Sequence, residues 1–157
     1  MNSIVEIPEL SKEETQKIAS EMFVGILVGT GAYIRQKLGP EAEDELGTMA
    51  AEGCAMNLNA LGIDTPLKYA LHYATMSKNL HGSDVEVEGD SRSAILDTKT
   101  CATLKAAMEF KEEGMPISRE EYCSGCIDGY HKKVAANIGL NLDATFTKDG
   151  CRMMITK

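Results

Sequence analysis

The hydrophobic pattern of this chain changes its period near residue 84, and that change decides the fold class. Apolar residues before it recur every three or four positions, whereas residues 85–88 read Val-Glu-Val-Glu. A period of 3.6 is typical of helices and a period of 2 is typical of strands. Two alternating stretches predict two hairpins, 85–98 and 140–155, each with a glycine in its turn. Strands that come in adjacent pairs need no parallel crossover, so we predict an α+β fold with a four-stranded antiparallel sheet.

Five or so helices are expected to pack on this sheet. Ser11 with Glu14, and Ser118 with Glu121, form capping boxes that mark two helix starts. The expected helical segments are 11–39, 40–62, 65–82, 102–113 and 118–139. Helical spacing in the first segment selects Ile18, Met22, Phe23, Ile26, Leu27 and Ile34. In the second segment it predicts an inward face of Leu46, Met49, Ala50, Cys54, Leu58 and Leu61.

Length and charge limit the class of protein. A chain of 157 residues fits one domain, which we divide into a helical part, 1–82, and an αβ part, 83–157. The net charge of −8 argues against nucleic acid and anionic membranes as partners. The first ten residues resemble no signal peptide, and no apolar run approaches the roughly 20 residues of a membrane span. We therefore expect a cytoplasmic protein with reduced thiols.

Four cysteines carry the chemical information. Cys101 falls where a strand passes into a helix, Cys123 and Cys126 are spaced C-x-x-C, and Cys151 opens the last strand. Residues at the ends of elements can converge at one edge of a sheet. Thiolate is a soft ligand, so four thiols predict a zinc ion or an iron–sulfur cluster. The N-terminus of the helix over 118–139 is expected to favour thiolate at the C-x-x-C pair.

Other interpretations of these cysteines stay open. A redox dithiol with a resolving cysteine is one, and plain core packing is another, because free cysteine is often buried. Cys54, in the middle of an apolar helical stripe, is interpreted as a core residue. His131 lies five residues after Cys126, away from the face of that thiol, and is interpreted as a surface histidine.

An aromatic stripe supplies a candidate ligand pocket. Tyr69, His72 and Tyr73 share one face of the third expected helix, and Tyr130 lies on the same helical face as Cys126. These four residues are our candidate pocket lining. The alternative is an ordinary core whose polar tips reach its rim.

The second half of the chain resembles a known family. The resemblance rests on three features. They are a strand that leads to a cysteine at the start of a helix (Asp97 to Cys101), the pair Cys123 and Cys126, and an alternating segment that ends in Cys151 to Ile155. This arrangement resembles the 2-amino-thiazoline-4-carboxylate hydrolase-like family and is similar to the vinyl reductase type of small-molecule-binding domain. The resemblance implies helices over an antiparallel sheet, a ligand pocket near the cysteines, and hydrolytic ring opening of a cyclic cysteine derivative.

Three functions remain open at this level. The first is a small-molecule-handling protein, a hydrolase by resemblance, whose iron–sulfur cluster or zinc is held by the four cysteines. The second is a non-enzymatic redox or metal and ligand sensor that acts through a partner chain. The third is a homodimer whose cysteines only brace the fold, with Gly25 and Gly29 on its contact surface. No catalytic residue is assigned.

Overall fold

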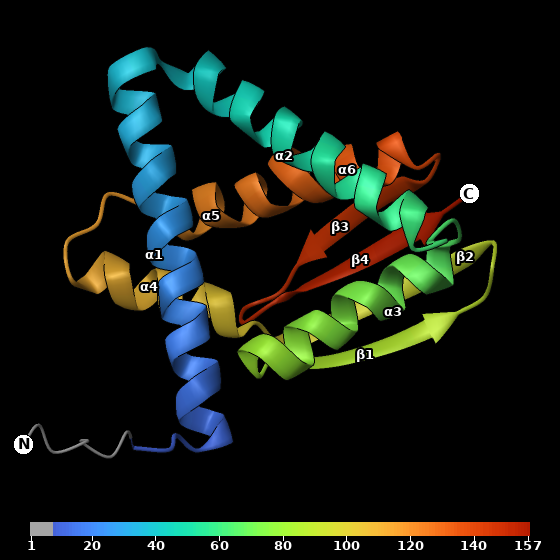
Figure 1. Cartoon of the computed structure of the whole chain (residues 1–157), viewed down its shortest axis with the longest axis horizontal. Helices are drawn as coiled ribbons and strands as arrows, with labels where there is room; N and C mark the ends of the chain where they lie inside the picture. Colours follow the sequence, from blue (N-terminus) through green and yellow to red (C-terminus); the bar gives the residue numbers. More distant parts are fainter. Residues whose placement is uncertain (1–7) are drawn as a thin grey trace, which may run out of the picture.

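The computed structural model describes residues 8–157 and confirms the α+β fold (Figure 1). Its strands form one antiparallel sheet in the order β1-β2-β4-β3, built from the two predicted hairpins. The elements in chain order are α1 (Lys12–Leu38), α2 (Pro40–Ala60), α3 (Pro66–Met76), η1 (Ser77–His81), β1 (Asp84–Gly89), β2 (Ser93–Thr100), α4 (Ala102–Glu112), α5 (Arg119–Cys126), η2 (Ile127–His131), α6 (Lys132–Asn137), β3 (Asn141–Phe146) and β4 (Cys151–Thr156). The start of the chain, on which the signal-peptide prediction depends, lies mostly outside the described residues.

One face of the sheet packs against helices and the other is open. Ala94, Leu96 and Thr98 of β2 are buried and alternate with more exposed neighbours. α3 packs on β1, β2 and β4, and α6 packs on β3, on the same inner face (Figure 1). The outer face carries ion pairs, such as Lys99 with Glu86 at 3.4 Å. This alternation is the pattern expected of an antiparallel sheet that is solvated on one side.

Two groups of buried side chains hold the layers together. The sheet cluster joins the inner face of the sheet to α2, α3 and α6, and its most buried members include Leu58, Tyr69 and Ile155. The α4 cluster joins α1, α4 and α5 through Val24, Val28, Leu104, Ala106, Ala107, Tyr122 and Cys123. Each cluster takes residues from both 1–82 and 83–157, so the two parts of the chain share their hydrophobic cores.

The predicted inward face of the second helix is confirmed at Leu58 and at the partly buried Cys54, but it is wrong at Leu46, Met49, Ala50 and Leu61. The buried residues of α2 are Ala51, Ala55 and Leu58, whereas Met49 is 69% exposed. Leu46 and Leu61 are exposed as well. A helical period detects an apolar stripe but does not say which stripe faces the core. Small residues let α2 lie close to η2: a Cβ at Gly47 would lie 3.0 Å from the Gly129 carbonyl oxygen.

The first helix is also exposed along much of its length. Its buried residues are Ser20, Val24 and Val28, and none of them belongs to the stripe selected from the sequence. Within residues 8–157, α1 is the one helix long and apolar enough to cross a membrane, and 17% of its most apolar window is buried. From the sequence we expect no segment able to span a membrane, but α1 has the length and the composition of one. Signal sequences and the core helices of soluble proteins share this length and composition, and the cytoplasmic location stays a prediction.

The predicted helix 118–139 is interrupted by a π-helical turn. α5 ends at Cys126, η2 forms the wider turn, and α6 resumes at Lys132. A π-turn adds a residue to one helical turn, so side chains beyond it face a different direction from those of an unbroken helix. The capping box at Ser118 and Glu121 is present, so the start of this helix is confirmed.

Candidate thiol site

Cys101 caps the helix that follows the second strand. It is the N-cap residue of α4, and its Sγ atom lies 3.4 Å from the Leu104 amide nitrogen, which donates to it. The Cys101 amide donates to the Asp149 carbonyl oxygen at 2.8 Å, which ties the cysteine to the β3–β4 turn. The Sγ atom is therefore held at a helix N-terminus, beside the turn that precedes the last strand.

Cys151 begins the last strand next to the end of β2. It pairs with Thr98 of β2 and with Phe146 of β3. Its neighbour Gly150 lies so close to β2 that an added Cβ would be 2.0 Å from the Thr98 carbonyl oxygen. Only glycine fits there, and this close approach positions Cys151 near the end of the strand that leads to Cys101.

The C-x-x-C pair is carried by α5. Cys123 is buried within the α4 cluster, and Cys126 is partly accessible at the last residue of the helix. Burial raises the pKa of Cys123 and, more strongly, that of Cys126. Cys126 is the last residue of α5, so the prediction that the helix N-terminus favours thiolate at both cysteines is wrong for Cys126.

The four thiols are electrostatic neighbours. The pKa of Cys126 is raised first by burial and then by Cys101, Cys151 and Cys123. Burial, followed by Cys101 and Cys123, raises the pKa of Cys151 to about 12. Because unlike charges would lower these values, the shifts identify a buried site that disfavours four uncompensated thiolates. Cys101 is thus near enough to the other three thiols to disfavour their charge, and burial favours the protonated form of Cys123, Cys126 and Cys151.

The thiol site fits a soft metal by its donors but not yet by its geometry. All five cysteines of the chain are free thiols, and thiol sulfur suits zinc or iron–sulfur clusters. Among residues 8–157, however, no three His, Cys, Asp or Glu side chains are arranged so that they could hold a metal ion. The sulfur atoms would have to draw together to form a coordination sphere.

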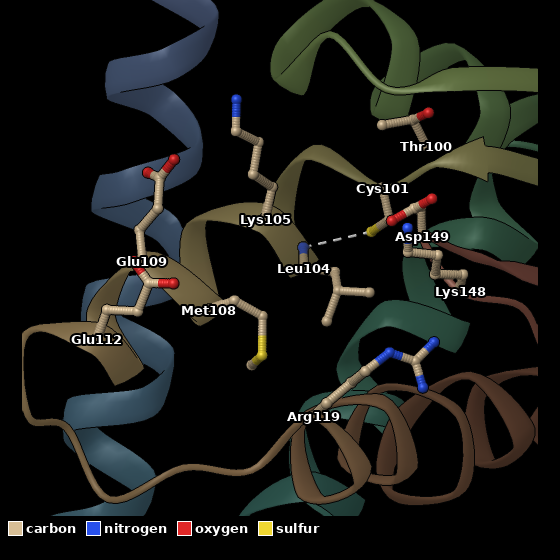
Figure 2. A pocket seen from close by; sticks show the side chains of 10 residues that line it. All are labelled: Thr100, Cys101, Leu104, Lys105, Met108, Glu109, Glu112, Arg119, Lys148 and Asp149. Atoms are coloured by element: carbon tan, nitrogen blue, oxygen red, sulfur yellow. Dashed lines mark hydrogen bonds between the residues drawn. The ribbon is translucent and has the colours of Figure 1, made fainter.

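A pocket of about 400 Å³ opens beside Cys101 (Figure 2). Its polar lining has both signs of charge. The cations are Lys105, Arg119 and Lys148, and the anions are Glu109, Glu112 and Asp149. Cys101, Leu104 and Met108 supply the less polar part of the lining. In Figure 2 the Cys101 side chain lies between α4 and the turn that carries Lys148 and Asp149.

The aromatic residues predicted to line a pocket form a packed cluster instead. Tyr69 is fully buried, and its ring centroid is 4.8 Å from that of Tyr73. The Tyr130 hydroxyl donates to Cys54 Sγ at 2.7 Å. His72 stacks edge-on against Tyr73 at 5.2 Å and is partly exposed. This arrangement matches the alternative of an ordinary core with polar tips at its rim, and the pocket of Figure 2 lies elsewhere.

The aromatic cluster also contains a residue that the sequence interpretation missed. His131 is 9% exposed and not on the surface, because η2 turns it inward. Its ring centroid is 4.5 Å from that of Tyr73. Cys126 raises the pKa of Tyr69 and Tyr73 as a minor cause after burial, so this cluster lies next to the thiols. The one sequence signal was the spacing: five residues separate Cys126 from His131, which places the histidine on a different face of a regular helix from that cysteine.

A scan against protein-family models finds no match, and a search of curated proteins also finds none. The resemblance described above therefore stays a prediction.

Proposed function

We propose that this chain binds zinc or an iron–sulfur cluster through Cys101, Cys123, Cys126 and Cys151, and a small molecule in the adjoining pocket. One observation carries the proposal: the four thiols come from three separate parts of the fold, and Cys101 still raises the pKa of each of the other three. Four like groups that disfavour each other's charge are stabilised together by a bound cation.

The electrostatics support a metal better than a reactive dithiol. A nucleophilic or redox-active cysteine needs a low thiol pKa, and such cysteines lie in electropositive surroundings. Here burial raises the pKa of Cys126 and Cys151. Metal binding replaces the thiol protons, so the affinity for metal should rise steeply with pH.

The pocket lining supports a zwitterionic ligand. Arg119 and Lys105 can bind a carboxylate, and Glu109 or Asp149 can bind an ammonium group. A small cyclic compound that carries both groups would satisfy both signs of charge in about 400 Å³. Such a compound agrees with the cyclic cysteine derivative that the family resemblance implies.

Hydrolysis is the activity that this combination would serve. A metal held by three of the four thiols would keep one position open, and from it would supply a Lewis acid that polarises a bond of the bound compound. The residues of the pocket would orient the compound: Arg119 and Lys148 from one side, and Glu109 and Glu112 of α4 from the other. This part of the proposal depends on the resemblance as well as on the lining.

Metal analysis tests the thiol part directly. Protein purified without oxygen is expected to contain stoichiometric zinc, or iron with sulfide and visible absorption. Cys126→Ser should remove most of the metal. Cys54→Ser is the matched control, because Cys54 accepts from Tyr130 and is not among the groups that raise the pKa of the four thiols. Metal-free wild type with five titratable thiols, after metal is offered during refolding, would contradict the proposal.

A ring-opening assay tests the pocket part. Incubation of the metal-loaded protein with 2-amino-thiazoline-4-carboxylate should release a thiol that a chromogenic disulfide detects. Lys105→Ala should reduce the rate at low substrate concentration, and Lys111→Ala, also on α4 but outside the pocket lining, should not. Release of thiol at the rate of the protein-free solution would reject this substrate, while the metal analysis would still decide the thiol site.

A further inference from the structure

α1 carries an exposed apolar stripe that follows a heptad spacing. Ala19, Met22, Ile26, Gly29 and Tyr33 are separated alternately by three and four residues, and we name them the α1 seam. Met22, Ile26 and Tyr33 are 62%, 67% and 63% exposed. An added Cβ at Gly29 would meet nothing within 4 Å, whereas one at Gly25 would meet Phe110 of α4 at 3.5 Å. The seam is thus free of contacts on the side away from α4.

α2 carries a second stripe of the same kind. The residues Ala42, Leu46, Met49, Gly53, Met56 and Ala60 alternate in spacing between four and three, and we name them the α2 seam. Met49 and Met56 are 69% and 74% exposed, and no charged residue interrupts the set. The opposite side of α2 packs on η2 and α6. Three large side chains, Leu46, Met49 and Met56, face outward, whereas the buried side holds Ala51, Ala55 and only one large residue, Leu58. A helix of a chain that stands alone usually buries most of its large apolar residues.

Both seams lie on one side of the molecule. α1 packs on α4, and α2 packs on α6 and η2. In Figure 1 α1 crosses in front of α4, and α2 crosses in front of α6, so the free sides of both helices face the viewer. The two seams therefore face the same side of the molecule.

The spacing of the seams indicates a helical partner. Apolar residues repeating every 3.5 positions are buried when one helix packs along another with a left-handed crossing. A bilayer would not fit α1 as it stands, because Val24 and Val28 hold it in the α4 cluster. Its C-terminal end is also tied by Arg35 to Glu43 and Glu121. Lipid could surround this helix only if these contacts were broken.

We propose that a second copy of this chain covers the seams, with the two α1 helices antiparallel and crossing at Ile26. The six large side chains of the seams, Met22, Ile26, Tyr33, Leu46, Met49 and Met56, are between 40% and 74% exposed. A stable interface takes about 800 Å² from each partner, and a patch of this many large apolar side chains can supply an area of that order. A two-fold axis at Ile26 places equal lengths of seam on each side, because Ala19 and Tyr33 are both seven residues from it. A self-complementary patch is what a two-fold dimer requires.

The order of side chains along α1 suits this antiparallel register. Positions equally distant from Ile26 become neighbours across the axis, so Tyr33 meets Ala19 and Met22 meets Thr30. In each pair a large side chain faces a small one, as packed helices need. Glu13 in the acidic first turn of α1 also comes beside Lys37 in the last turn of the partner helix, whereas Arg35 stays paired with Glu43 and Glu121 of its own chain. Antiparallel helices have opposed dipoles, which adds to this complementarity.

Light scattering after gel filtration tests the proposal. The wild-type chain should have twice the monomer mass of 17.0 kDa. Ile26→Glu and, separately, Met49→Glu should return it to the monomer mass at the same concentration. Met154→Glu is the matched control, because Met154 is 50% exposed on the open face of the sheet and should leave the dimer intact. A wild-type monomer, or one that floats with phosphatidylcholine vesicles, would overturn the proposal.

Cross-linking tests the register independently of those variants. Ile26→Cys should form an intermolecular disulfide under mild oxidation, because the two copies of this position meet at the axis. Thr75→Cys, on the exposed side of α3, should form no more than the wild type. A dimer without the cross-link at residue 26 would overturn the antiparallel crossing.

Discussion

The hydroxyl group of Tyr69 lies 3.1 Å from the Nδ1 atom of His131 and 3.2 Å from the carbonyl oxygen of the same residue. Tyr69 belongs to α3 and His131 closes the π-helical turn η2, so this contact joins the layer over the sheet to the α5–α6 helix. π-turns are frequent at functional sites, and this one directs a histidine into the protein interior beside the thiols.

The stability of the protein should fall at mildly acidic pH because of His131. Burial lowers the pKa of this histidine to about 4, against 6.5 in the unfolded chain. The unfolded state therefore binds more protons between these values, and stability is lost as the pH falls from about 6.5 to about 4. We expect a loss of up to about 3 kcal/mol. Urea unfolding at pH 7 and pH 4.5 measures this loss, and His131→Gln should reduce the difference in unfolding free energy between the two pH values. An equal difference in the wild type and the variant would show that His131 does not cause the loss.

Removal of the Tyr69 hydroxyl should destabilise the fold. Tyr69→Phe keeps the ring but leaves the buried Nδ1 atom of His131 without this partner, whereas every buried side-chain nitrogen or oxygen within residues 8–157 now has one. The expected loss is about 1–3 kcal/mol, measured by urea unfolding. Tyr33→Phe, at an exposed position, should change stability by no more than about 0.5 kcal/mol. Equal effects of the two substitutions would count against the hydrogen bond.

A methyl group at Gly150 should disrupt the edge of the thiol site. Gly150→Ala places a Cβ 2.0 Å from the Thr98 carbonyl oxygen, which belongs to the backbone and cannot move without breaking β2 from β4. We expect a loss of about 3 kcal/mol or more, together with reduced metal content. Gly125→Ala is the control, because it lies on α5 between the cysteines with nothing within 4 Å of its Cβ position, and it should be neutral or stabilising. Thermal unfolding of both variants measures these changes in stability, and equal melting temperatures would contradict the prediction.

Alkylation should distinguish folded from unfolded thiols. Burial raises the pKa of Cys151 to about 12 and that of Cys126 further, so few thiolates exist at neutral pH. Iodoacetamide at pH 8 should modify these two cysteines far more slowly in metal-free native protein than in urea, where the thiol pKa is about 8.5. Peptide mass spectrometry follows each site. Equal rates in the two states would show that burial does not govern these thiols.

Local chemistry explains why the elements could be predicted. Ser11 and Ser118 start their helices through side-chain bonds to residues three positions on. The turn glycines Gly39, Gly82 and Gly139 all have positive φ, which residues with a Cβ adopt rarely. Alternation in 85–88 and 151–155 reflects one buried face of the sheet. These signals act within a few residues, so the sequence alone contains them.

The sequence by itself determined the helices, the hairpins and the positions of the four cysteines at or near element ends. Only the tertiary structure decided which stripe of α1 and α2 is buried, because Val24 and Ala51 meet partners that are distant in sequence. The same holds for His131, whose direction depends on a π-turn stabilised by the surrounding packing. The raised pKa of Cys126 likewise depends on long-range neighbours. Helical period and spacing describe one element at a time, whereas burial and charge depend on every element that surrounds a side chain.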